Sequence, residues 1–275
     1  MTATRTHLSE DLARLSLKPG DIVMVHASLR AIGPVEGGAD SVIGAILDTI
    51  GPEGTMVMVL GVEIDGYDAI CRLPQDEQKA AVAALPPLDL STAPALKEVG
   101  ALAEVFRTWP GVQLVPNPDG RFAALGADAE RLLKDPPWHD YHGPNSVLDR
   151  LCDKQGKILR LGADPETVTL LHLAEYYAGV ADKRRVRRWY NLAGTDGGSD
   201  GPGLVHVDTL DDENGIVDWP DSDYFADILN EFLASGKAAF GRVGRARAEL
   251  FSANDIVCFG SKWMTAHLNP KKRAS

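Results

Sequence analysis

The sequence predicts an α/β fold: a central, largely parallel sheet flanked by helices, with antiparallel strands added toward the C-terminus. Residues 21–26 and 55–60 are short, almost wholly apolar runs, which is typical of strands buried on both faces of a parallel sheet. Residues 39–50 carry apolar side chains at helical spacing, so the three segments predict a strand–helix–strand unit with a right-handed crossover. Residues 186–192 and 204–210 alternate in polarity, which indicates an antiparallel pair.

The other elements follow from the same two periodicities. Ser9 is placed to cap a first amphipathic helix. Residues 61–95 are irregular and contain several prolines, with one short helix near 78–84, and a long insertion of this kind is usually functional or mobile. We expect further helices over 96–109, 127–133, 146–152, 169–175 and 224–233, and further strands over 122–126, 158–162, 240–246 and 256–259.

Composition is that of an ordinary globular protein. The chain has 275 residues, of which 44% are hydrophobic and 24% are charged, so it can bury a large core. We expect a single domain over residues 1–270 and a disordered tail over 271–275.

Charge and cysteine usage narrow the class of partner. A net charge of −11 argues against nucleic acid; the acidity either suits a cationic small molecule or only keeps the protein soluble. Cys71, Cys152 and Cys258 lie far apart and form no CxxC pair, which favours reduced thiols in the cytoplasm and argues against zinc. We expect no membrane partner, because no run approaches ~18 apolar residues and the start lacks the apolar core of a signal peptide.

His172 is the first candidate for chemistry. It lies with Glu175 on one face of a predicted helix that follows the strand and turn of residues 157–164. A histidine at the end of a strand–loop–helix unit is well placed to accept a proton at neutral pH. A lone histidine on an apolar helix is more often packed in the core, so its neighbours decide between the two.

Residues 25–30 and the glycine-rich loop after them are a candidate anion site. They follow a buried strand, and open α/β sheets bind ligands at the carboxyl ends of their strands through exposed amides. Without a GxGxxG pattern or a P-loop lysine, the segment also fits a plain connection in which Ser28 caps a turn. Two later arginines, Arg242 and Arg245, are either structural or available to phosphates.

Two acidic groups have two explanations each. The turn 211–215 and the trio Glu63, Asp65 and Asp68 are either solvated loops or clusters that hold an ammonium or orient a histidine. His139 and His142 raise the question of a metal, but no third ligand follows at a convincing spacing, so we expect none. The Gly-x-Ser-x-Gly pattern of serine hydrolases is absent.

Together these segments resemble the aminoglycoside 3-N-acetyltransferase family, which is unrelated in fold to the GNAT acetyltransferases. Several long segments in register are far more specific than any one of them, and they span most of the chain. They are residues 25–33 with 35–38, 51–55, 106–111, 157–163, 167–175, 182–186, 214–216, 243–246 and 250–260.

The resemblance implies acetyl transfer from acetyl-CoA to the 3-amino group of the 2-deoxystreptamine ring. We expect no metal, and either a monomer or a homodimer. By the family pattern His172 is the base, and Asp212 orients it or holds the substrate amine, with Glu175 as a further catalytic carboxylate. The CoA residues are expected to be His26, Ala27, Ser28, Leu29, Arg30 and Val35, and the aminoglycoside residues Glu63, Asp65, Asp68, Asn117 and Glu213. Direct transfer in a ternary complex is expected, since no cysteine has a recognisable nucleophile context.

The chain departs from the family pattern at segments expected to face a ligand. Asn117 stands where the family has histidine, and Arg121 where it has serine. Ser146-Val147 replaces a Ser-Pro, and the acidic segment 61–68 also differs. Two alternatives stay open: transfer to another small amine, for which Arg121 would suit an anionic substrate, and non-catalytic binding of a cationic antibiotic.

Overall fold

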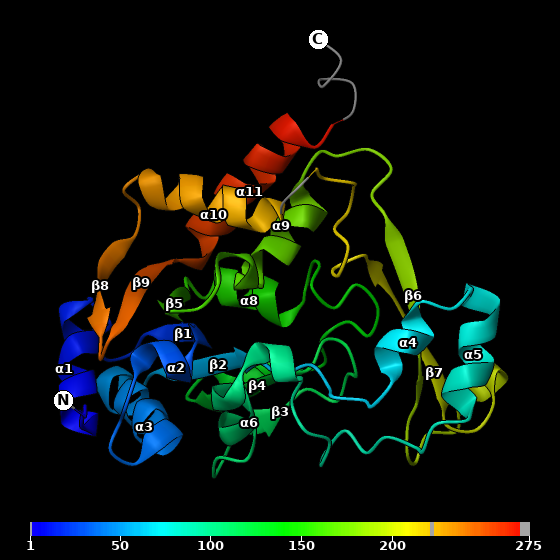
Figure 1. Ribbon diagram of the computed structural model, residues 1–275, viewed down its shortest axis with the longest axis horizontal. Helices are drawn as coiled ribbons and strands as arrows, with labels where there is room; N and C mark the ends of the chain where they lie inside the picture. Colours follow the sequence, from blue (N-terminus) through cyan, green and yellow to red (C-terminus); the bar gives the residue numbers. More distant parts are fainter. Residues whose placement is uncertain (1, 221–222, 270–275) are drawn as a thin grey trace.

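The computed structural model describes residues 2–220 and 223–269. A seven-stranded sheet forms the centre of the body, in the order β3-β4-β2-β1-β5-β9-β8 (Figure 1). Its strands are β1 (Ile22–Ala27), β2 (Thr55–Val59), β3 (Gln113–Leu114), β4 (Phe122–Gly126), β5 (Lys157–Leu161), β8 (Ala239–Val243) and β9 (Ala246–Ser252).

The centre of the sheet is parallel and its edges are antiparallel. β1 pairs in parallel with β2 on one side and with β5 on the other, as the strand–helix–strand prediction requires. β4 then runs antiparallel to β2, and β9 antiparallel to β5. The carboxyl ends of β1, β2 and β5 therefore meet at one edge, where an α/β sheet binds its ligands. The α/β fold class is confirmed.

Helices cover both faces of the sheet because side chains along each strand alternate. In β1, Val23 and Val25 pack with one set of helices, and Ile22 and Met24 with the other. The first set is α1 (Arg5–Arg14), α2 (Leu29–Ile32), α3 (Gly38–Ile50) and α6 (Ala101–Arg107), with η1 (Lys97–Val99) before α6. The second set is α7 (Ala129–Leu133), α8 (Val147–Asp153), α9 (Leu170–Tyr177), α10 (Tyr224–Ala234) and α11 (Ala253–His267), with η2 (Pro165–Thr167) leading into α9.

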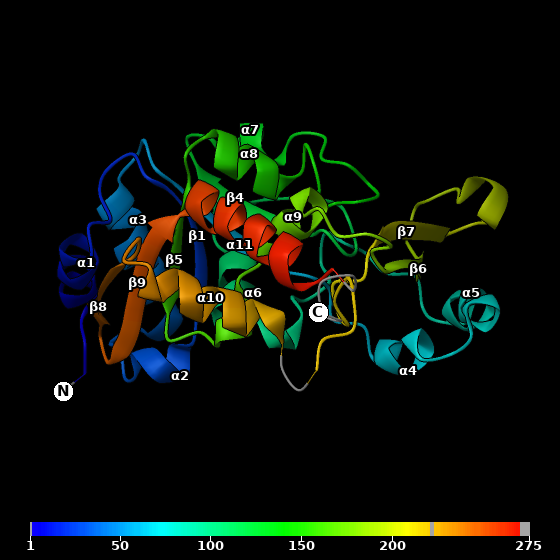
Figure 2. The ribbon, with the colours of Figure 1, turned by 90° about the horizontal axis from the view of Figure 1, so that it is seen from above.

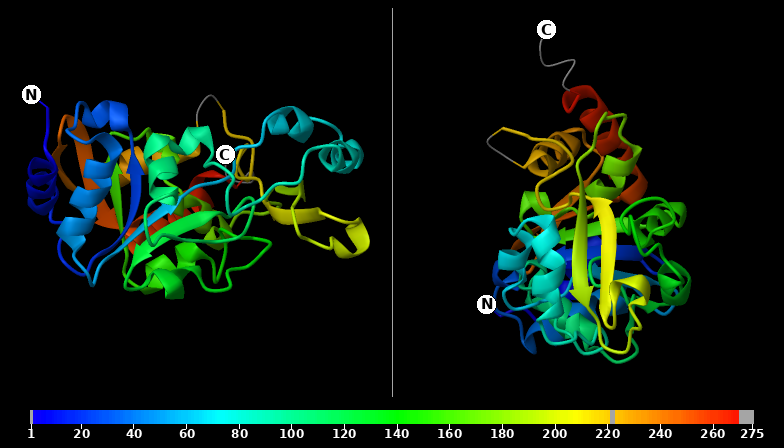
Figure 3. Two further views of the ribbon diagram at one scale, coloured as in Figure 1. Left: turned by 90° about the horizontal axis from the view of Figure 1, so that it is seen from below. Right: turned by 90° about the vertical axis from the view of Figure 1, so that its right-hand side faces the viewer.

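A lobe extends from one end of this body (Figure 2; Figure 3, left). It combines the predicted antiparallel pair with the irregular insertion 61–95, which forms two helices rather than one. The Tyr67 hydroxyl donates to the Trp189 carbonyl oxygen at 2.6 Å, and this bond ties insertion to hairpin. The elements of the lobe are α4 (Tyr67–Cys71), α5 (Gln75–Ala83), β6 (Arg185–Asn191), η3 (Gly198–Asp200) and β7 (Leu204–Leu210).

Four local predictions were wrong. Thr4 caps α1, so Ser9 lies inside that helix and is not its cap. Residues 256–259 lie inside α11, which Ser252 caps and whose buried residues recur at helical spacing, so they form no strand. The helix expected over 96–109 covers only Ala101–Arg107, because Gly100 breaks it with a positive φ of 88°. The strand expected over 240–246 is divided between β8 and β9 by a turn at Gly244.

No helix in the described part of the chain combines the length and apolar character needed to cross a bilayer. The tail expected over 271–275 lies outside the described residues. The single-domain boundary at residue 270 stays a prediction.

Candidate active site

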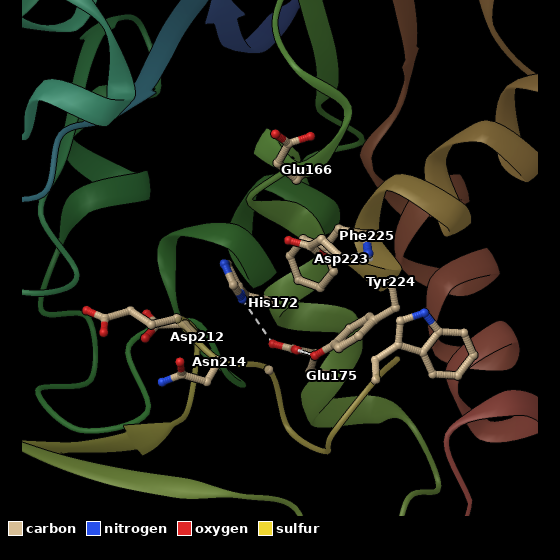
Figure 4. A pocket seen from close by; sticks show the side chains of 11 residues that line it. Glu166, His172, Glu175, Asp212, Asn214, Asp223, Tyr224 and Phe225 are labelled. Atoms are coloured by element: carbon tan, nitrogen blue, oxygen red, sulfur yellow. Dashed lines mark hydrogen bonds and ion pairs between the residues drawn. The ribbon is translucent and has the colours of Figure 1, made fainter. Parts of the chain in front are cut away.

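His172 and Glu175 form the hydrogen-bonded pair that their spacing predicts. His172 is the third residue of α9, and its Nδ1 lies 3.0 Å from Glu175 Oε2. The imidazole is partly accessible, with 18% of its side-chain area exposed, whereas the Glu175 side chain is 1% exposed. The helix thus buries the carboxylate and leaves the ring partly exposed; Figure 4 shows the two side chains pointing toward each other.

The buried carboxylate is fixed from a second direction. The Tyr224 hydroxyl donates to Glu175 Oε1. That hydroxyl also accepts the Ile216 N–H at 3.1 Å, which ties the late loop to the start of α10. With Nδ1 of His172 committed to Glu175, the other ring nitrogen is turned away from this network (Figure 4) and is the one available to a substrate.

Two rings hold the imidazole in place. His142 stacks on His172 with ring centroids 4.8 Å apart and planes 6° from parallel. Phe225 packs on His172 at 4.7 Å. Burial, with the charge of nearby His172, lowers the pKa of His142 to about 3, so this second imidazole stays neutral at physiological pH.

Electrostatics makes His172 a stronger base than a free histidine. Burial opposes its charged form, but the hydrogen bond that its ring N–H donates to Glu175 and the negative charges of Glu175, Asp212 and Asp223 outweigh burial and raise its pKa above the usual 6.5. Burial also raises the pKa of Glu175, against the opposing pull of His172 and Tyr224. The carboxylate therefore stabilises an imidazolium when His172 accepts a proton.

The pair opens into a cavity of about 240 Å³. A larger cavity of about 690 Å³ lies between the body and the lobe. Asp212, Glu213 and Asn214 line both. The larger cavity is also lined by His142, whose ring stacks on that of His172, so the two cavities lie next to each other.

The larger cavity gathers the predicted acidic residues. Glu63, Asp65 and Asp68 come from the insertion, and Glu213 comes from the late loop more than a hundred residues later. Buried Asp119 joins them, and burial raises its pKa to about 7. Glu63 is already paired with Lys97, and Asp65 and Asp68 are exposed. Both explanations of the acidic clusters, as solvated loops or as sites for ammonium groups, therefore stay predictions.

Asp212 is held as a fixed negative charge beside the histidines. Arg188 Nη2 lies 2.7 Å from its Oδ1, and the Tyr141 hydroxyl donates to its Oδ2. His142 Nδ1 lies 3.8 Å from the same Oδ2. Burial alone would raise the pKa of Asp212, but the Arg188 guanidinium and both histidines hold it well below its usual range.

Of the departures from the family pattern, the acidic segment 61–68 lines the larger cavity, whereas Asn117 and Arg121 line neither. Asn117 is 2% exposed, and its side chain bonds the Trp138 carbonyl oxygen and the backbone N–H groups of Asp119 and Gly120. It therefore holds the turn that carries Asp119. Arg121 is fully buried, which removes the reason to expect that it binds an anionic substrate.

The predicted CoA segment lies at the carboxyl end of β1. Among the described residues, none of the six predicted there lines either cavity, and the His26 side chain is buried at 6% exposure. Ser28 caps α2 by accepting the Ala31 N–H at 3.2 Å. The Arg245 side chain packs directly against Gly33 at the end of α2. The larger cavity extends close to this segment. Val99 lines the cavity, and the next residue, Gly100, lies against the Ala27 carbonyl oxygen.

Other reactive groups are poorly placed for the chemistry. Cys71 lines the larger cavity, but burial raises the pKa of its thiol to about 11, which leaves it protonated and weakly nucleophilic. In residues 2–220 and 223–269, no three His, Cys, Asp or Glu side chains are grouped to bind a metal ion.

The sequence profile of the aminoglycoside 3-N-acetyltransferases matches residues 24–265. The chain belongs to this family. Aminoglycoside N(3)-acetyltransferase VII of Streptomyces paromomycinus is 37% identical over 98% of this chain and 94% of its own. The family, the enzyme class and the acyl-transfer chemistry expected from sequence are confirmed.

Solved structures of family members superpose closely on the chain. The binary complex of AAC-IIIb with CoASH has a TM-score of 0.86 at 37% identity and covers 96% of this chain and 97% of its own. AAC-VIa bound to sisomicin has a TM-score of 0.87 at 35% identity, and the match covers 97% of this chain and 98% of that chain.

Four residues of this acetyltransferase site escaped sequence reasoning. Tyr224 and Arg188 were read only as parts of a helix and a strand, and their partners Glu175 and Asp212 lie 49 and 24 residues away. Asp119 carried no signal in an irregular segment. His142 was considered only as a metal ligand, and its closeness to His172 comes from the fold.

Proposed function

We propose that the chain acetylates the 3-amino group of the 2-deoxystreptamine ring of aminoglycosides, with His172 as general base and direct transfer from acetyl-CoA. The observation that carries this proposal is the His172–Glu175 pair opening into a cavity that shares its wall with a larger acidic one. An alkylammonium is no nucleophile, so a base must remove its proton before or during attack on the thioester.

The acidic cavity supplies the positioning. An aminoglycoside carries several ammonium groups, and each needs a carboxylate or carbonyl partner when it leaves water. Glu63, Asp65, Asp68, Asp212 and Glu213 provide such partners on several sides of one space. The AAC-VIa neighbour was solved with sisomicin bound, which supports an aminoglycoside for this cavity.

Acetyl-CoA is the acyl donor. The AAC-IIIb neighbour holds CoASH, and the family reaction is acetyl transfer. We assign the donor to the carboxyl end of β1, at residues 26–30 with Val35, close to Arg30 and to Arg245, whose side chain packs against Gly33. These arginines are suited to the phosphates. The Ser28 N–H already donates to the Leu161 carbonyl oxygen at 3.0 Å, so it is not the donor for the developing oxyanion.

Direct transfer is preferred over an acyl-enzyme. Cys71 is the cysteine that lines the larger cavity, and its raised pKa leaves it a thiol. The neutral amine attacks the thioester carbonyl while His172 accepts a proton from the attacking nitrogen; the C–S bond then breaks, and the CoA thiolate takes up a proton and leaves as the thiol.

Release of CoA thiol tests the proposal with acetyl-CoA and gentamicin, tobramycin, neomycin or sisomicin. We expect release with aminoglycosides and mass gain of one acetyl group at the 3-amino position, located by NMR. Release only with other amines, or aminoglycoside binding without release, would contradict it.

A further inference from the structure

Arg121 lies beneath the point where the insertion leaves and rejoins the body. Its Nη1 donates to the carbonyl oxygen of Ala93 at 2.9 Å, and to those of Gly61 and Pro94 at 3.4 Å each. The side chain is fully buried, and its Nε and Nη2 have no hydrogen-bond partner among the described residues. A single nitrogen of the Arg121 guanidinium thus donates to backbone carbonyls at both the start and the end of the insertion.

The two ends form a neck, defined as residues 60–63 and 93–97. Backbone bonds run across it, from Leu96 N to Leu60 O at 2.9 Å and from Glu63 N to Pro94 O at 3.2 Å. The neck is also bonded to the residue just before β4, because Leu60 N donates to the Arg121 carbonyl oxygen at 2.8 Å. Arg121 therefore contacts the neck through both its backbone and its side chain.

The neck sets the position of one wall of the acidic cavity. Gly61, Val62, Glu63 and Leu96 belong to it and line the cavity directly. Asp65 and Asp68 follow within a few residues and line it too. A shift of the neck would move these carboxylates together relative to Asp212, which is fixed on the other side by Arg188.

We propose that Arg121 is a positioning residue for the amine substrate, which acts by clamping the neck so that the carboxylates of the insertion face the cavity. This inference rests on the proposed function, which assigns the aminoglycoside to that cavity. A buried guanidinium that meets only carbonyl oxygens is costly compared with an apolar side chain, so its effect is on specificity of position more than on net stability.

Arg121→Met and Arg121→Lys separate positioning from folding. Methionine fills much of the space and offers no donor, whereas the lysine ammonium carries three donors for the three carbonyls. Arg150→Met is the matched control, because Arg150 also donates to backbone carbonyls, those of Leu132, Lys134 and Asp135, and these line neither cavity.

Two readouts are needed for each variant: KM for tobramycin and for acetyl-CoA, and hydrogen–deuterium exchange resolved by peptide. For Arg121→Met we expect the KM for tobramycin to rise about tenfold, the loss typical of one charge-assisted hydrogen bond. The KM for acetyl-CoA should stay near wild type, and exchange should rise in the neck while β1 and β5 stay protected. Arg121→Lys should recover most of both effects, and Arg150→Met should show neither.

An unchanged KM for tobramycin and unchanged exchange in Arg121→Met would overturn the clamp. It would also fall if exchange rose equally across the sheet and both KM values increased, because Arg121 would then only support the fold. Failure of the proposed function is distinguishable: wild type would release no thiol with tobramycin, and the exchange comparison would still decide whether Arg121 holds the neck.

Discussion

The small cavity at His172 and the large acidic cavity beside it are built in different ways. The small one depends on a pair three residues apart in one helix, which any fold that forms α9 brings together. The large one combines the insertion, the hairpin strand β6 and the late loop, which meet only in the folded chain. The comparison teaches that the proposed base and its carboxylate come from one helix, whereas the proposed recognition residues are distributed over a lobe and a late loop.

His172→Ala should have the largest effect on this comparison, because it removes the base and leaves the acidic cavity intact. We expect kcat to fall about a hundred- to ten-thousand-fold, the usual contribution of general base catalysis. The KM for the aminoglycoside should change little. Steady-state thiol release measures both, with a thermal melt as the check on folding. Near-normal turnover would show that His172 is not the base.

Asp212→Asn should have the next largest effect, because Asp212 belongs to both cavities. The change removes the charge that Arg188 binds at 2.7 Å and leaves that buried guanidinium short of a partner. We expect kcat/KM to fall about ten- to a hundred-fold, as for loss of a charged hydrogen bond or two. Asp208→Asn, which breaks an exposed pair with Arg187, is the control and should behave as wild type.

Asp68→Asn should have the smallest effect, because Asp68 is an exposed member of a distributed set. We expect the KM for tobramycin to rise only about two- to fivefold, with kcat unchanged, and the effect to shrink at high salt. Asp76→Asn on α5, which lines neither cavity, is the control. A large fall in kcat would mean that the lobe contributes to the chemical step.

The same contrast explains which features could be predicted from the sequence and which could not. Buried apolar runs predicted β1 and β2, and helical spacing predicted the His172–Glu175 pair, since both depend on neighbours within one element. The stacking of His142 on His172 depends on the loop before α8 meeting α9, which no local pattern encodes.

Errors in the sequence-based assignments have the same origin. Residues 256–259 have the β-branched, apolar character of a strand, but the cap at Ser252 and the buried face of α11 override it. Asn117 and Arg121 were expected to face a ligand, yet their polar atoms serve the backbone of the surrounding turns and neck. The sequence showed that Asn117 and Arg121 differ from the family pattern, but their backbone partners can be identified only in the folded structure.

The pH dependence of kcat/KM in wild type and in Glu175→Gln, with one aminoglycoside and saturating acetyl-CoA, tests the central claim most directly. His172 must be neutral to act, and Glu175 helps raise its pKa, so wild-type activity should rise with pH through a value above 6.5. Removing the negative charge lowers the pKa of His172, so the acidic limb should move to lower pH while the maximal rate falls. An acidic limb that stays in place in Glu175→Gln would contradict the account, since the carboxylate would then not set the basicity of the catalytic group.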